Sequence, residues 1–234
     1  MTLLCTAAGA PALLPATGAE SPEEERLHTD WPYLARYRDQ NRELRDSATP
    51  VDAVFLGDSI TEGWLQKAPA FFSRGRICRG IGGQTTPQLL LRFRQDVIDL
   101  RPRVVHILGG TNDIAGNTGP STLKMIQDNF LCMTEIAMAN RVQLVFASIP
   151  PASDFPWRPE LETVAPIAAM NAWLREHATR AHATYADYFA VMSDGKGGMR
   201  DGLSSDHVHP TEAGYAAMGP VAEAALLRAL SVRH

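Results

Sequence analysis

Short apolar runs alternate along the chain with segments in which apolar residues recur every three or four positions. The clearest run, residues 104–108, is rich in β-branched side chains and ends at two glycines, which is typical of a buried strand. Similar runs predict further strands over residues 51–56, 76–79, 142–147 and 184–187. Strands that alternate with helices indicate βαβ units, and therefore a parallel sheet covered by helices on both faces.

The helical periodicity is clearest after Pro120, where apolar residues at 123, 126, 130, 133 and 137 place one stripe on the core. Further helices are predicted over residues 31–45, 87–98 and 162–181. A terminal helix is expected to begin at Pro210, and Gly219-Pro220 is expected to break or kink it.

Three residues that suit catalysis, Ser59, Gly83 and Asn112, each follow a predicted strand by a few positions. In open parallel sheets, ligands bind beyond the carboxyl ends of the strands, at the point where the strand order reverses. The fold is therefore expected to bring these residues to one edge of the sheet, although they are far apart in the sequence.

Length and charge limit the kind of protein. The 234 residues favour one domain, and the composition is that of a globular protein. The net charge is −4, with Lys and Arg scattered rather than clustered, so no nucleic acid is expected as a partner. No run of about 18 apolar residues occurs, so no stable membrane insertion is expected.

The first residues differ in composition from the rest. Residues 1–19 carry no charge and resemble the apolar part of a secretory signal, with a possible cleavage site at residues 17–19, but a positively charged start is missing. We divide the chain into a tail or signal-peptide remnant, residues 1–25, and a domain, residues 26–234. Export to the periplasm or the medium is favoured over a cytoplasmic protein with a disordered extension. Two buried thiols and one in the tail are expected from Cys5, Cys78 and Cys132.

A hydroxyl, an imidazole and a carboxylate supply the parts of a nucleophilic site. Ser59 lies just past a buried strand, in a turn that Gly57 permits, and is a candidate nucleophile. His209 precedes a proline at a helix start, where the helix dipole disfavours imidazolium, so it suits a general base. Asp206 can orient the His209 ring. Two structural interpretations stay open: Ser59 as a helix cap, and His209 in a solvent-facing His-Pro turn.

Hydrogen-bond donors for an oxyanion are also present. Gly83 can bring a bare backbone N–H to a developing oxyanion, where a Cβ can obstruct the approach, and Asn112 can offer its side-chain NH₂. A glycine turn and an Asx turn are the structural alternatives. Asp206, His207 and His209 are potential metal ligands, but no further His or Cys cluster completes a site, so neither a metal nor another cofactor is expected.

Taken together, these blocks resemble the SGNH (GDSL-type) hydrolase superfamily. The matches are Gly57-Asp58-Ser59, Gly83, Asn112 and Asp206-His207-Val208-His209. Residues 55–64 are most similar to the branch of the platelet-activating-factor acetylhydrolases and bacterial carbohydrate acetyl esterases. Two departures are Ile60 in place of a leucine and Gln84 where an acidic residue is frequent.

The resemblance implies a flavodoxin-like, three-layer α/β/α fold with a mainly parallel five-stranded sheet. It also implies Ser59 as nucleophile, His209 as base and Asp206 as its orienting group. The backbone N–H groups of Ser59 and Gly83, with the Asn112 side chain, would form the oxyanion hole.

The expected function is that of a serine esterase that forms an acyl-enzyme on Ser59 and prefers a short acyl group such as acetyl. A lysophospholipase or thioesterase with longer acyl chains is the first alternative, and a non-catalytic carbohydrate-binding module is the alternative from another class. Trp64 and Trp157 are candidates for substrate binding, the latter because it lies in a long loop of the kind that carries specificity. The expected partner is a small-molecule or carbohydrate ester, and a homodimer stays open.

Overall fold

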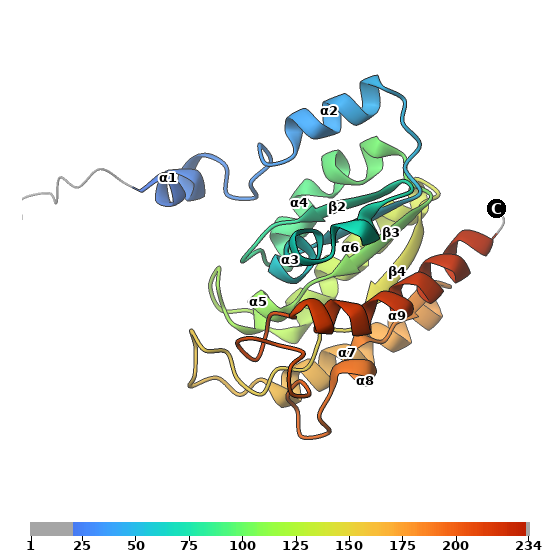
Figure 1. The fold of residues 1–234 in the computed structure, drawn as a ribbon. Coiled ribbons are helices and arrows are strands. Elements are labelled where there is room, and N and C mark those ends of the chain that lie inside the picture. Colours follow the sequence, from blue (N-terminus) through green and yellow to red (C-terminus); the bar gives the residue numbers. More distant parts are fainter. Residues whose placement is uncertain (1–20, 233–234) are drawn as a thin grey trace, which may run out of the picture.

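The computed structural model describes residues 21–232, in which a five-stranded sheet has only parallel pairings. The strands are β1 (Ala53–Gly57), β2 (Arg76–Gly80), β3 (Val104–Leu108), β4 (Gln143–Ala147) and β5 (Thr184–Ala186). Their order, β2-β1-β3-β4-β5, is that of flavodoxin-like folds. The predicted α/β fold with a five-stranded parallel sheet is therefore confirmed (Figure 1).

Helices pack on both faces of the sheet because every second side chain of a strand points to the same face. In β1, Val54 and Leu56 belong to one buried cluster, whereas Ala53 and Phe55 belong to the other. The first cluster includes α4 (Thr86–Asp96), α6 (Leu123–Ala139) and α7 (Val164–Arg180). The second includes α3 (Ser59–Lys67), α8 (Tyr188–Met192) and α9 (Glu212–Ser231).

The shorter elements are α1 (Pro22–Thr29), α2 (Arg38–Asp46), α5 (Thr111–Ile114) and the 3₁₀ turns η1 (Pro69–Phe72) and η2 (Ile98–Leu100). Helix α1 lies at one side of the molecule in Figure 1, and the predicted domain boundary at residue 26 falls inside it. The residues predicted as a signal remnant, 1–19, lie outside the described part of the chain. Within that part, no helix has the length and apolar character needed to cross a membrane.

The helix predicted over residues 31–45 begins only at Arg38. Upstream, side-chain amides of α4 take the backbone carbonyls that a helix would need: Gln88 Nε2 donates to the Trp31 carbonyl at 2.8 Å and Gln95 Nε2 to the Leu34 carbonyl at 2.7 Å. The segment also contains Pro32, which has no N–H to donate. Tertiary hydrogen bonds have therefore displaced a helix that the apolar spacing favours.

Gly219-Pro220 was predicted to break or kink the terminal helix, and a break is wrong because α9 continues through Pro220. A proline leaves the carbonyl four residues earlier without its helical partner. Here both Pro220 and Ala216 are exposed, so water can solvate that carbonyl. A second correction concerns the cysteines: Cys78 is buried as expected, Cys132 is exposed, and Cys5 lies outside the described residues.

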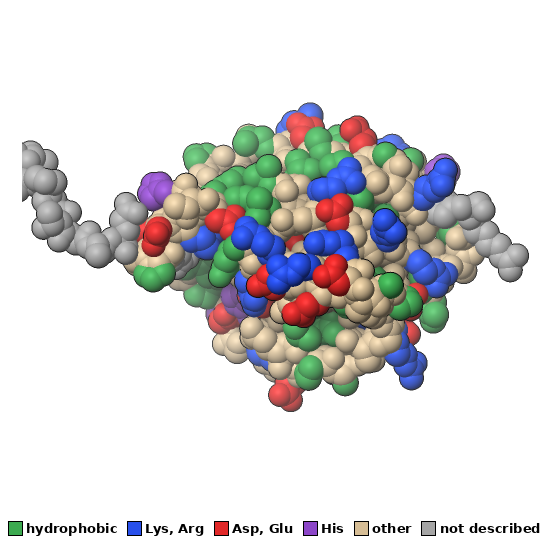
Figure 2. Space-filling model, turned by 90° about the horizontal axis from the view of Figure 1, so that it is seen from above, with side chains coloured by type: hydrophobic (Ala, Val, Ile, Leu, Met, Phe, Trp, Pro, Cys, Tyr) green, Lys and Arg blue, Asp and Glu red, His purple; other side chains and the backbone are tan. Residues whose placement is uncertain are grey.

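The face that carries α2 mixes charges of both signs. In Figure 2, which views the molecule from above Figure 1, Lys and Arg side chains are interspersed with Asp and Glu. Helix α2 itself contains three arginines, two aspartates and a glutamate, and Arg42 pairs with Asp39 at 2.9 Å. This face therefore does not present a field of a single sign.

Candidate active site

The carboxyl ends of three neighbouring strands lie level at one edge of the sheet. Gly57, the last residue of β1, pairs with Gly80 of β2 on one side and with Leu108 of β3 on the other. The strand order reverses between β1 and β3, which is where open α/β sheets bind ligands. This register brings to one edge the residues that follow the three strands: Ser59, Gly83 and Asn112.

Ser59 is the first residue of α3, so its backbone N–H has no acceptor inside the helix. The preceding residue, Asp58, caps the helix, and its Oδ1 accepts from the Ile60 N–H at 3.0 Å. The turn is tight: a Cβ on Gly57 would lie 2.1 Å from Thr61 Oγ1 and 2.7 Å from the Leu108 carbonyl oxygen. Only glycine therefore allows α3 to follow β1 this closely.

A hydrogen-bonded chain joins Ser59, His209 and Asp206. Ser59 Oγ lies 2.9 Å from His209 Nε2, and His209 Nδ1 lies 2.6 Å from Asp206 Oδ2. The Asp206 carboxylate also accepts from the His209 backbone N–H at 2.7 Å and from the Val208 N–H at 3.1 Å. Burial alone would raise the pKa of Asp206, but these hydrogen bonds lower it below its ordinary value. Asp206 therefore stays charged beneath the imidazole.

His207, although adjacent in sequence, does not join this chain. Its Nδ1 lies 2.8 Å from Asp154 Oδ2, in the loop that precedes α7, and its side chain is mostly exposed. His207 and His209 therefore interact with different carboxylates. Among residues 21–232, no group of three or more His, Cys, Asp or Glu side chains is arranged to hold a metal ion.

Gly83 lies in the turn after β2, with a φ of +72°. A Cβ built on it would meet nothing within 4 Å, so the left-handed conformation, rather than crowding by the protein, requires glycine here. The neighbouring turn residue is close to the serine, since a Cβ on Gly82 would lie 3.8 Å from Ser59 Cβ. Within the described chain the Gly83 amide donates to no residue, whereas the Gly82 amide donates to Glu62 Oε2 at 2.9 Å.

The Asn112 side chain is buried between the turns that carry Ser59 and Gly83. Its Nδ2 donates to the Gln84 carbonyl at 3.0 Å and lies 3.4 Å from Asp58 Oδ2. The second distance is long for a hydrogen bond, so one N–H is only weakly engaged. Burial raises the pKa of Asp58 to about 7, so the Asp58 carboxyl that faces this N–H is protonated below neutral pH.

The two tryptophans predicted to bind substrate have different surroundings. Trp64 is 1% exposed and stacks on Phe71 and Tyr215, with ring centroids 4.5 and 5.5 Å away. The prediction that it lines the substrate cleft is therefore wrong, because Trp64 is a core residue that packs from α3 against α9.

Trp157 is 40% exposed, and its ring centroid lies 6.3 Å from that of His209. It stacks on the buried Phe155 at 5.3 Å. Its Nε1 donates to Asn117 Oδ1 at 3.1 Å. The structure therefore brings Trp157, but not Trp64, to the edge of the candidate site.

A buried arginine, which the sequence analysis did not single out, contacts the turns that follow β1 and β2. Arg92 of α4 is fully buried and donates to Gln84 Oε1 at 2.6 Å, to the Gly57 carbonyl at 2.8 Å and to Asp96 Oδ2 at 3.0 Å. Burial lowers its pKa, and the Asp96 carboxylate opposes that shift. The sequence feature that could have identified Arg92 is its position within the apolar stripe of the helix predicted over residues 87–98.

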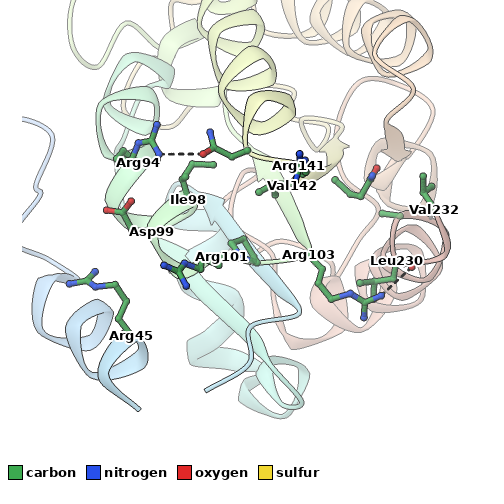
Figure 3. A pocket seen from close by; sticks show the side chains of 14 residues that line it. Arg45, Arg94, Ile98, Asp99, Arg101, Arg103, Arg141, Val142, Leu230 and Val232 are labelled. Carbon is green, nitrogen blue, oxygen red and sulfur yellow. Dashed lines mark hydrogen bonds between the residues drawn. The ribbon is translucent and has the colours of Figure 1, made fainter. Parts of the chain in front are cut away.

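A cavity of about 630 Å³ lies at the other end of the sheet, where β3 and β4 begin. Five arginines line it, and Figure 3 shows their guanidinium groups pointing in different directions. Arg94 is directed to Asn140 at 3.4 Å, and Arg103 to the Leu230 carbonyl at 3.3 Å. None of the sequence-predicted site residues lines this cavity.

A Ser–His–Asp chain at the carboxyl edge of a parallel α/β sheet is an arrangement that serine hydrolases use. The model of the GDSL-like lipase/acylhydrolase family matches residues 55–217, and the chain belongs to this family. The protein is therefore a carboxylic ester hydrolase, as the sequence analysis predicted.

Two solved structures are similar over most of the chain. One, an acylhydrolase by description from Bacteroides fragilis NCTC 9343, is 39% identical and matches 86% of this chain and 99% of its own, with a TM-score of 0.81. The other, a GDSL-like lipase by description from Bacteroides thetaiotaomicron VPI-5482, is 38% identical, with coverages of 86% and 100% and a TM-score of 0.81.

A curated protein of Bacillus subtilis (strain 168), named uncharacterized lipoprotein YqeF, is 56% identical over 79 residues. The match covers 27% of this chain and 32% of that protein. The chain thus spans about a third of the length of this relative.

Proposed function

We propose that the protein is a serine esterase that hydrolyses esters with a short acyl group through an acyl-enzyme on Ser59. The hydrogen-bonded chain from Ser59 Oγ to His209 Nε2 and from His209 Nδ1 to Asp206 Oδ2 carries the proposal. It supplies a nucleophile, a base and an orienting carboxylate in contact with one another, which is the requirement for acyl transfer.

In the first step, Ser59 Oγ attacks the ester carbonyl carbon while His209 Nε2 takes the hydroxyl proton. Asp206 accepts from the Nδ1–H and so keeps Nε2 free to act as the base. The tetrahedral oxyanion receives hydrogen bonds from the Ser59 and Gly83 N–H groups and from Asn112 Nδ2. The intermediate then collapses, the C–O bond to the alcohol breaks, and the alcohol leaves with the proton from His209.

Water completes the reaction in the same way. His209 takes a proton from the water molecule, the hydroxide attacks the acyl carbon, and Ser59 leaves with the proton returned to its oxygen. The products are the free acid and the regenerated hydroxyl, so this reaction requires no cofactor.

A pocket of about 630 Å³ beside Gly83 supports a short acyl group and a polar alcohol. Helix α1 and the segment that follows it form one of its walls, with Pro22 and Leu27 among the apolar residues. A long acyl chain would require a continuous apolar channel, because each buried CH₂ contributes about 0.8 kcal/mol. Most of the lining side chains are instead polar: Arg26, Tyr33, Arg36, Glu62, Gln84, Gln88, Asn117 and Thr118.

A panel of p-nitrophenyl esters from acetate to palmitate tests this proposal. Acetate and butyrate are expected to exceed octanoate by roughly tenfold or more in kcat/KM, the scale that a poor pocket fit costs. A preference for palmitate would establish the lysophospholipase or thioesterase alternative. Inactivity on every ester would favour the non-catalytic carbohydrate-binding module.

We also propose that the protein is exported, on the basis of the apolar residues 1–19 and the name of the Bacillus subtilis relative. Cell fractionation of the full chain in its native host is expected to place it outside the cytoplasm, and recovery in the cytoplasmic fraction alone would contradict export.

A further inference from the structure

Two consecutive hydrogen bonds link the exposed Trp157 to the candidate oxyanion donor Asn112, and a third continues from Asn112 to Gln84. Trp157 Nε1 donates to Asn117 Oδ1 at 3.1 Å, and Asn117 Nδ2 donates to Asn112 Oδ1 at 2.8 Å. Asn112 Nδ2 in turn donates to the Gln84 carbonyl at 3.0 Å. In each of these three hydrogen bonds a donor faces an acceptor, so the amide groups of both asparagines have defined orientations.

We propose that Asn117 is a positioning residue, which holds the Asn112 amide with its NH₂ toward the oxyanion and connects it to the loop that carries Trp157. This inference rests on the proposed function, because it requires Asn112 to act as an oxyanion donor. Asn117 itself does not touch the reacting atoms and acts through Asn112.

The orientation of the Asn112 amide follows from its two partners. If this amide rotated by 180°, its NH₂ would face the NH₂ of Asn117, and its oxygen would face the Gln84 carbonyl. Both contacts would be repulsive. Removing the Asn117 side chain leaves only the Gln84 carbonyl and the weak contact with Asp58 Oδ2 at 3.4 Å to hold the amide, so Asn112 would present its NH₂ for a smaller fraction of the time.

The backbone around Asn117 is held independently of its side chain. The Asn117 N–H donates to the Asn112 carbonyl at 3.0 Å, and Thr118 Oγ1 lies 3.0 Å from Thr85 Oγ1. Arg158, next to Trp157, donates to the Ala115 carbonyl at 3.1 Å. Because these contacts do not use the Asn117 side chain, variants at this position are expected to fold.

The loop that carries Trp157 is also attached to the other half of the site. Asp154 in this loop pairs with His207 at 2.8 Å, two residues from the base. Trp157 therefore lies on a segment fixed both at the turn that bears Asn117 and at the loop that bears His209. A substrate that rests on the indole contacts a group hydrogen-bonded, through Asn117, to the oxyanion donor.

The test compares Asn112→Ala, Asn117→Ala and the double variant in p-nitrophenyl acetate hydrolysis. Loss of a direct oxyanion donor lowers kcat by about 10²–10³, and loss of its positioning residue is expected to lower kcat by about tenfold, with KM little changed. Since Asn117 acts through Asn112, the double variant should be no slower than Asn112→Ala.

Two further substitutions test separately the two hydrogen bonds of the Asn117 side chain, one to Asn112 and one from Trp157. Asn117→Asp keeps the acceptor for Trp157 but sets a carboxylate against Asn112 Oδ1, so its kcat should fall at least as far as that of Asn117→Ala. Trp157→Phe keeps an aromatic ring but loses the N–H, and because that bond is exposed its effect on kcat should be smaller than that of Asn117→Ala. Arg158→Ala, the matched control, removes the neighbouring attachment without touching either asparagine and should retain parental kcat.

Multiplicative losses in the double variant, a change in KM alone, or parental kcat in both Asn117 variants would overturn the inference while leaving Ser59-dependent hydrolysis intact. A parent protein that hydrolyses no ester would instead remove the proposed function, and the role of Asn117 with it. Thermal unfolding of each variant identifies any loss of kcat that comes from misfolding.

Discussion

At the scale of single residues, the role of a polar or aromatic side chain in the site depends on which neighbours it contacts. Ser59, His209 and Asp206 could be proposed from the sequence because their chemistry and their motifs are visible there. Asn117 could not, because an asparagine in a turn has no periodicity and no characteristic spacing. Trp64 was misassigned for the converse reason: a tryptophan five residues after the serine has the same sequence pattern whether it faces a cleft or the core.

Asp58 provides a prediction about pH at this scale. Burial raises the pKa of its carboxyl to about 7 in the folded protein, whereas an aspartate in an unfolded chain titrates near 3.9. Between these pH values the folded state binds a proton that the unfolded state lacks. The contribution of Asp58 to the free energy of unfolding is therefore greatest below about pH 4 and declines as pH rises to about 7.

Asp58→Asn is the matched variant, because its amide oxygen can still cap α3 but does not titrate. Urea unfolding of both proteins between pH 4 and pH 8 is expected to show the stability of the parent, relative to the variant, falling up to about pH 7 and then levelling off. A difference that stays constant with pH would show that Asp58 titrates normally.

At the scale of elements, apolar periodicity located all five strands to within a few residues, because strands of a parallel sheet are buried on both faces. It failed where side chains distant in sequence take the backbone hydrogen bonds. The segment before Arg38 is the clearest case, since Gln88 and Gln95 of α4 occupy carbonyls that the predicted helix would have used. Such contacts are tertiary and leave no local pattern.

Helix α9 provides the prediction at this scale. Pro220 lies inside the helix on its exposed side, where a proline costs about 3 kcal/mol relative to alanine. Alanine there also makes the unfolded chain more flexible, which offsets about 0.4–1 kcal/mol. Pro220→Ala is therefore expected to raise the free energy of unfolding by about 2–2.6 kcal/mol in urea denaturation. A destabilised variant would mean that Pro220 makes a packing contact that this account lacks.

At the scale of the whole molecule, the five strands run parallel, so the sheet has a carboxyl end and an amino end, and different residues gather at each. The carboxyl ends collect Ser59, Gly83 and Asn112, and the loop before α9 adds Asp206 and His209. The opposite end carries the arginine-lined cavity, which none of these residues lines. The sequence predicted that Ser59, Gly83 and Asn112 meet at the carboxyl end, because residues that follow parallel strands lie at the same edge of the sheet. The arginines of the cavity come from separate loops and helices, which only the folded chain brings together.

The central claim is that Ser59 is the nucleophile of an ester hydrolase, and covalent labelling tests it most directly. A fluorophosphonate probe followed by peptide mass spectrometry is expected to give one adduct, on Ser59. Ser59→Ala should lose both labelling and ester hydrolysis while keeping the thermal transition of the parent, because Ser59 Oγ bonds only to His209 within the described chain. An adduct on another residue, or substantial hydrolysis by folded Ser59→Ala, would contradict the account.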